Sequence, residues 1–235
     1  MPLLGTVATN SDTGTTTVDV TFNLLSGSTR IMIAMLVSER TNTQSHTSVV
    51  IDPAGDNISM TNVAGASAGV WDGSRENRIS FWYCLDTNLP STTGNKTIRG
   101  TIGNNADIGL TVFTIRDAVQ QAPEDSDVTS STSTLTLNRT ITATHRAFMI
   151  CGSHHGEGAD STSTGDNQTE LSDADLGGGR SCVSYEIRQG AGDETLSHTS
   201  DGSTSTRMVL GALSFEMYAS GLQPLMSMTP VLYVG

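Results

Sequence analysis

The chain has 235 residues, a formal net charge of −12 and only 36% hydrophobic residues, and 24 of its residues are glycines. Nucleic-acid binding through a basic surface is excluded, because only 12 residues are Lys or Arg against 24 that are Asp or Glu. The acidic balance also disfavours an anionic membrane surface, and no apolar run reaches the roughly 18 residues of a membrane span. Abundant Thr, Ser and Gly favour short strands joined by polar turns.

Residues 1–14 are expected to form an N-terminal arm, and residues 15–119 a first β half. In this half, hydrophobic residues alternate from Val18 to Leu25, which predicts a strand with one buried face. Ile31 to Val37 is almost entirely apolar and predicts a strand buried on both faces. Further strands are expected at 49–51, 79–85, 96–102 and 108–115, with a stop at 103–105 between the last two.

Residues 120–134 are polar and acidic, and they are predicted to connect the first half to a second β half at 135–219. Strands are expected there at 135–141, 147–151, 182–187, 195–198 and 208–218. His154 to Gly179 is rich in Gly, Asp, Ser and Thr, which predicts a long loop. A single turn at 173–176 is the only helical candidate. The sequence therefore predicts an all-β, antiparallel, jelly-roll-like sandwich.

A weak internal repeat relates the two halves. Ser28-Thr-Arg-Ile-Met-Ile resembles Thr144-His-Arg-Ala-Phe-Met, which aligns Arg30 with Arg146. Residues 78–85 then align with 180–187, and residues 109–116 with 209–216. The pattern predicts two pseudo-repeats of about five strands each. They either pair face to face in one sandwich or stand as tandem sandwiches; we favour one sandwich, because each half holds few large apolar residues.

The segment 220–235 is predicted to be an extended C-terminal arm. Pro224 and Pro230 prevent a continuous helix, so its apolar side chains cannot be buried on an amphipathic helix. The arm either docks on a neighbouring subunit or closes its own sandwich as a last strand. The candidate interface residues are Leu222, Leu225, Met226, Val231, Leu232 and Tyr233.

Three cysteines, Cys84, Cys151 and Cys182, lie in apolar runs and are predicted to be reduced and buried. The start of the chain lacks the charged residues and the apolar stretch of a signal peptide, so synthesis in a cytoplasm is expected.

The most metal-like cluster is His154-His155 with Glu157 and Asp160. Adjacent residues of a strand face opposite sides, so we favour a polar loop over a metal site. The acidic stretch 160–175 lacks the spacing of a calcium loop, and no nucleophile elbow or phosphate-binding loop is present. We therefore predict no catalytic residue, no metal and no cofactor. A catalytic pair of carboxylates of the glycosidase type stays an open alternative, because such a pair is defined by the distance between the two carboxylates in space.

One segment is strongly aromatic. Trp82 faces opposite to Phe81 and Tyr83, so at least one face of this strand belongs to the core. We favour a strand buried on both faces. The alternative is an exposed platform for a ligand, formed by Trp71, Trp82 and Tyr83.

The Arg-led apolar strand after Ser26-Gly-Ser, the aromatic strand at 79–85 and the alternating strands after it resemble β-sandwich modules of tailed-phage virion proteins and bacterial surface proteins. The resemblance spans residues 15–118 and rests on pattern, without an invariant motif. It implies a non-enzymatic virion protein, of the capsid decoration (cement) or spike type. Such a protein would bind the major capsid protein or other virion subunits, form a homo-oligomer and assemble in the host cytoplasm.

The alternative is a carbohydrate- or receptor-binding module of a tail fibre or surface protein, with a glycan as ligand. Neither class implies nucleic acid or a membrane.

Overall fold

The computed structural model describes residues 4–156, 161–175, 179–201 and 207–218. These ranges are built almost entirely of antiparallel strands and contain no α-helix, which confirms the predicted all-β fold. One 3-10 turn spans Asp86–Asn88. The strands are β1 (Leu4–Leu24), β2 (Ile31–Arg40), β3 (His46–Ile51), β4 (Ile58–Ser59), β5 (Thr61–Trp71), β6 (Glu76–Leu85), β7 (Gly94–Ile115), β8 (Asp125–Ser131), β9 (Thr136–Ala143), β10 (Ala147–His155), β11 (Thr162–Thr164), β12 (Thr169–Asp175), β13 (Arg180–Arg188), β14 (Gly192–Ser200) and β15 (Met208–Glu216).

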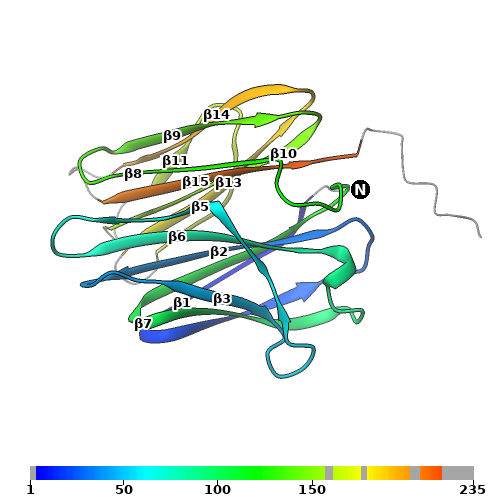
Figure 1. The fold of residues 1–235 in the computed structure, drawn as a ribbon, viewed down its shortest axis with the longest axis horizontal. Coiled ribbons are helices and arrows are strands. Elements are labelled where there is room, and N and C mark those ends of the chain that lie inside the picture. Colours follow the sequence, from blue (N-terminus) through cyan, green and yellow to red (C-terminus); the bar gives the residue numbers. More distant parts are fainter. Residues whose placement is uncertain (1–3, 157–160, 176–178, 202–206, 219–235) are drawn as a thin grey trace, which may run out of the picture.

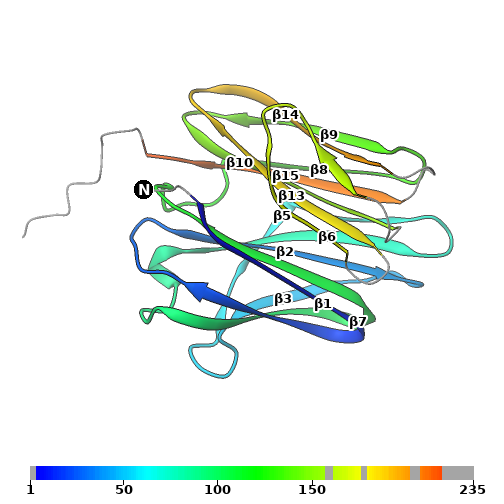
Figure 2. The ribbon, with the colours of Figure 1, turned by 180° about the vertical axis from the view of Figure 1, so that it is seen from behind.

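The two halves of the chain are stacked on each other, and each half has two layers (Figure 1; Figure 2 shows the reverse side). In the second half, the inner layer has the strand order β12-β13-β10-β15-β8 and the outer layer the order β11-β14-β9. In the first half, β1 and β7 run through both layers and join them into one folded sheet. Its inner layer contains β5, β6 and β2, and its outer layer contains β3 and β4.

Three hydrophobic cores separate these layers. One lies inside the first half, one inside the second half, and the third lies between the halves and is called the shared core below. Strand β2 contributes to two of them: Ile31, Ile33 and Met35 enter the shared core, whereas its alternate residues enter the core of the first half. This arrangement confirms that the β2 segment is buried on both faces. It also corrects our preference for a single sandwich of two layers, because each half has two layers and a core of its own. Strands that are buried on both faces contribute side chains to two cores, so few large apolar residues are needed.

The pairing of strands repeats between the halves. The C-terminal part of β7 lies between β2 and β1, as β15 lies between β10 and β8. The N-terminal part of β7 lies between β1 and β3, as β14 lies between β9 and β11. Continuous β1 and β7 of the first half therefore each correspond to two separate strands in the second half. The predicted pseudo-repeat exists at the level of topology.

The predicted alignment of Arg30 with Arg146 is wrong by one residue. It would pair Ile31, which faces the shared core, with Ala147, which faces the core of the second half. Phe148 faces the shared core instead and is the structural equivalent of Ile31. Because side chains alternate along a strand, a one-residue slip exchanges its two faces.

Several predicted loops are strands in the structure. The expected arm at 1–14 contains the start of β1, which pairs with β7. The expected connector at 120–134 contains β8, and the expected long loop from His154 to Gly179 contains the end of β10, β11 and β12. The helical candidate at 173–176 is wrong over its described residues, because β12 continues through Asp175. β8 and β12 are half-exposed edge strands, where polar residues on both faces leave no hydrophobic alternation to read.

Candidate functional site

The proposed aromatic platform is not assembled. Trp82 is buried, 7% exposed, and its indole Nε1 donates a hydrogen bond of 2.8 Å to Ser80 Oγ. Tyr83 is half-buried and packs edge-on against Phe215 with ring centroids 5.9 Å apart. Trp71 is 42% exposed but lies at the far end of β5, opposite Glu76. Our favoured prediction, that β6 is buried on both faces, is confirmed, because β6 lies between the shared core and the core of the first half.

The candidate interface in the C-terminal arm lies outside the described residues, as do Glu157 and Asp160 of the His154-His155 cluster. The two histidines themselves are the last residues of β10 and are fully buried, not part of a polar loop. His154 Nδ1 lies 3.1 Å from Ser181 Oγ, and His155 Nε2 lies 2.9 Å from Thr162 Oγ1. They project to opposite faces and bind separate hydroxyl partners, so they do not form a common metal site.

Two further histidines are held by serine hydroxyls. His198 places Nδ1 2.7 Å from Ser153 Oγ and Nε2 2.8 Å from Ser184 Oγ. His46 bridges Ser38 and Ser80 at 2.9 and 2.7 Å. Desolvation by burial lowers the pKa of His46, His154 and His198 to about 3, so these rings are neutral near pH 7.

The three cysteines are free and buried, as predicted. Burial raises the pKa of Cys84 to about 11 and raises the pKa of Cys151 and Cys182 further. Cys182 Sγ lies 4.0 Å from His198 Nε2, but that nitrogen is closer to Ser184. A buried thiol with a raised pKa is a poor nucleophile, so this Cys–His contact does not have the chemistry of a catalytic pair.

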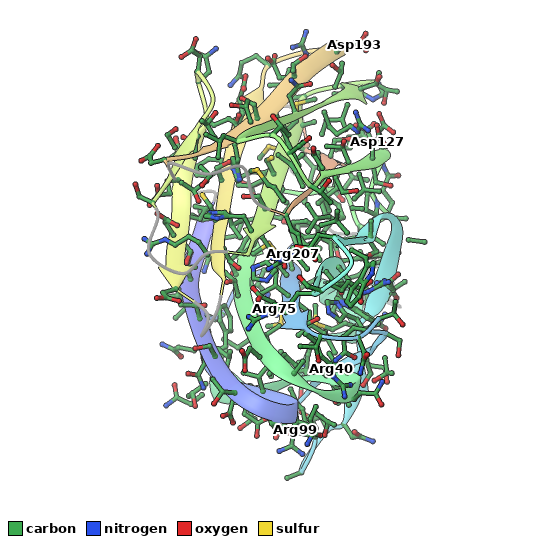
Figure 3. All side chains as sticks on the ribbon, turned by 90° about the vertical axis from the view of Figure 1, so that its left-hand side faces the viewer. Arg40, Arg75, Arg99, Asp127, Asp193 and Arg207 are labelled. Carbon is green, nitrogen blue, oxygen red and sulfur yellow. The ribbon has the colours of Figure 1, made fainter. Side chains whose placement is uncertain are left out.

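A partly buried ion-pair network joins the two halves at one end of the stack, where Arg207 and Arg75 lie close together (Figure 3). Arg207 precedes β15 and reaches across to the first half. Its Nε donates to Asn77 Oδ1 at 2.9 Å, its Nη1 pairs with Asp72, and its Nη2 lies 3.3 Å from Glu39 Oε1. Arg75 binds the same Glu39 oxygen at 2.6 Å. Burial raises the pKa of Glu39, while the two guanidinium groups oppose that shift.

An accessible cluster of ionisable groups lies at the opposite end of β10 and β15. Glu124 precedes β8, His145 lies in the turn between β9 and β10, and Glu216 ends β15. His145 Nδ1 lies 3.3 Å from Glu216 Oε1 and 4.0 Å from Glu124 Oε1. A cavity of about 420 Å³ adjoins the cluster; its lining includes His145, Glu216, Arg146 and Gln189. This cluster is the candidate functional site.

Sequence reasoning missed all three members of this cluster, because they come from distant segments and form no local motif. The pseudo-repeat offers the one usable signal. In the alignment of the closing strands, Glu216 corresponds to Arg116 of the first half. The second half therefore departs from the repeat at Glu216, where a basic residue is replaced by an acidic one.

In the described ranges, no helix has the length and apolar character needed to cross a membrane. No family model matches the chain, and no curated protein matches it. One solved structure, described as "Crystal Structure of the STIV MCP", is similar over 91% of this chain and 97% of its own, with 8% sequence identity and a TM-score of 0.28. A similarity this low carries no argument about function.

Proposed function

We propose that this protein is a structural component of a virion, of the capsid decoration or cement type, which binds a phage shell through protein–protein contacts. The observation that supports the proposal most is the construction of its body: two topologically equivalent halves packed through a shared core. A core shared by both halves holds them together as one block, which suits a structural role. The proposal has no catalytic step, and its partners are the major capsid protein and other copies of this chain.

The burial of the chemically reactive side chains also supports this proposal. All three cysteines and three of the five histidines are fully or almost fully buried, and the serine partners of His198 belong to the same half. These side chains act as interior hydrogen-bonding groups. The glycan-binding alternative has lost its aromatic platform, because Trp82 is inside the protein.

The test compares the full chain with a chain truncated after Ser220, each added to purified particles that lack this protein. We expect the full chain to sediment with the particles at a fixed ratio to the shell protein. The truncated chain should keep its folded circular dichroism spectrum and lose attachment or self-association. Failure of the full chain to bind any particle, together with its absence from purified virions by mass spectrometry, would overturn the proposal.

A further inference from the structure

We propose that Glu124, His145 and Glu216 form a binding site for a divalent transition-metal ion, for which Zn²⁺ is the test case. The inference is independent of the proposed virion role, because it rests on the chemistry of three side chains. These side chains come from three separate segments that meet beside an open cavity.

The spacing of the donor atoms suits a single ion. One donor atom from each residue can be chosen so that all three lie within 4.8 Å of one another. Two ligands bound at 2.0–2.1 Å to a tetrahedral zinc ion are about 3.4 Å apart. The 3.3 Å between His145 Nδ1 and Glu216 Oε1 matches this value. The 4.0 Å between His145 Nδ1 and Glu124 Oε1 is longer, so metal binding requires the carboxylates and the His145 ring to move closer together; the His145 side chain is 66% exposed and lies in a turn.

Glu124 supplies an independent indication of a ligand. Its side chain is only 8% exposed. Its Oε1 accepts a hydrogen bond from Thr144 Oγ1, but its Oε2 is buried and has no hydrogen-bond partner in the described part of the chain. A buried carboxylate oxygen without a donor is unfavourable, and a bound cation would satisfy it.

Glu216 is oriented for the same purpose. Gln121 Nε2 donates to Glu216 Oε2 at 2.9 Å, which leaves Oε1 directed toward His145. Hydrogen bonds of this kind, from a neighbouring residue to a ligating carboxylate, fix the ligand and tune its basicity in metal sites.

The donor set favours zinc or a similar ion over calcium or magnesium. Imidazole nitrogen suits Zn²⁺, Ni²⁺ and Cu²⁺, whereas Ca²⁺ needs six to eight oxygen ligands and Mg²⁺ an octahedron of oxygens. Two carboxylates with a neutral imidazole also balance the charge of a divalent ion. The adjoining cavity gives room for water at the remaining coordination positions. Arg146 lines the same cavity, so an anion could accompany the metal there.

The experiment titrates Zn²⁺ into the full-length, EDTA-treated protein at pH 7 and follows the heat of binding. We expect one site per chain, with affinity reduced about tenfold or more in H145A, E216Q and E124Q. The matched control is E170Q, an exposed glutamate on β12, which should bind like the wild type. Co²⁺ should give visible absorption bands that H145A lacks.

A second measurement uses the unaltered chain, so it does not depend on the folding of any variant. His145 is the most exposed histidine, since His154, His155 and His198 are buried and both ring nitrogens of His46 are hydrogen-bonded. Diethyl pyrocarbonate should therefore modify His145 first, and Zn²⁺ should slow that reaction. Absence of binding, equal affinity in all variants, or modification that Zn²⁺ does not slow would overturn the proposal. Those outcomes would identify the cluster as three neighbouring side chains that bind no metal.

Discussion

Gly152 on β10 lies directly opposite Gly211 on β15, and together they leave space for the ring of Phe81 in the shared core. A Cβ atom on Gly152 would come within 2.5 Å of Phe81 Cζ and of Met35 Sδ. A Cβ atom on Gly211 would lie 2.8 Å from the backbone oxygen of Ala66. The two halves approach each other closely because these two positions carry no side chain.

Substitution G211A should therefore destabilise the protein by about 1–3 kcal/mol, the usual cost of overpacking a core. The free energy of unfolding in urea measures the effect. G190A is the matched control, because no atom lies within 4 Å of a Cβ added there, and it should change stability little. Equal stabilities of the two variants would show that the shared core adapts to the extra methyl group.

Removal of Arg207 should cost more than removal of an exposed arginine. R207A leaves Glu39, whose side chain is 2% exposed, with Arg75 as its remaining cation, so the expected cost is about 1.5–3 kcal/mol, the range for a charged hydrogen bond. Arg99 and Asp19 form a surface pair, 42% and 44% exposed, so R99A should cost about 1 kcal/mol or less. In Figure 3, Arg207 lies near the middle of the view and Arg99 at its lower edge. Similar losses in both variants, measured by urea unfolding, would contradict a role of Arg207 in locking the halves.

Stability should fall as the pH is lowered below about 6.5. The folded pKa of His46, His154 and His198 is about 3, below the ordinary value of 6.5, so the unfolded chain binds more protons between these values. Each histidine then removes up to about 1.4 kcal/mol of stability per pH unit. The free energy of unfolding in urea, measured between pH 6.5 and 5, tests this fall in stability. Most carboxylates titrate below this pH range. H198N should reduce the slope, T195A should preserve it, and a flat profile would refute the assignment.

The cysteines should react in a fixed order. Native Cys84 is 4% exposed with a pKa raised to about 11, whereas Cys151 and Cys182 are fully buried with pKa values raised further. Ellman's reagent at pH 8 should label all three slowly in the native protein, Cys84 first, and all three quickly in urea. Rapid native labelling of Cys151 would show that the core of the second half opens easily.

The sequence predicted those strands whose burial produces a hydrophobic pattern. Val18, Val20, Phe22 and Leu24 alternate because only one side of that part of β1 faces a core. The continuous apolar run of β2 reflects its two buried faces. β8 and β12 were not predicted, because an edge strand is held by backbone hydrogen bonds to its neighbour. Such pairing tolerates polar side chains and leaves no hydrophobic pattern in the sequence.

The ends of long strands were equally hidden. Residues 103–105, Gly-Asn-Asn, were expected to stop a strand, yet β7 continues through them as it passes from the outer to the inner layer. Gly103 lies close to Ser45, where a Cβ atom would come within 2.5 Å of the serine Oγ. The glycine thus marks a close approach of two segments. The candidate metal site was unpredictable for a related reason: Glu124, His145 and Glu216 meet only when β15 has paired with both β8 and β10.

The strand at the centre of each half is also the last strand of that half to leave the ribosome. β7 pairs with β1, β2 and β3, all made before it, and β15 likewise pairs with β8 and β10. A nascent chain can form the hairpin of β5 and β6 early, and β6 can then pair with β2, but neither layer of the first half closes until Ile115 has emerged. Pairing over such sequence distances is slow, so the β2 edge stays open while translation proceeds. The pace of synthesis through residues 94–115 therefore sets how long this edge is exposed to other chains.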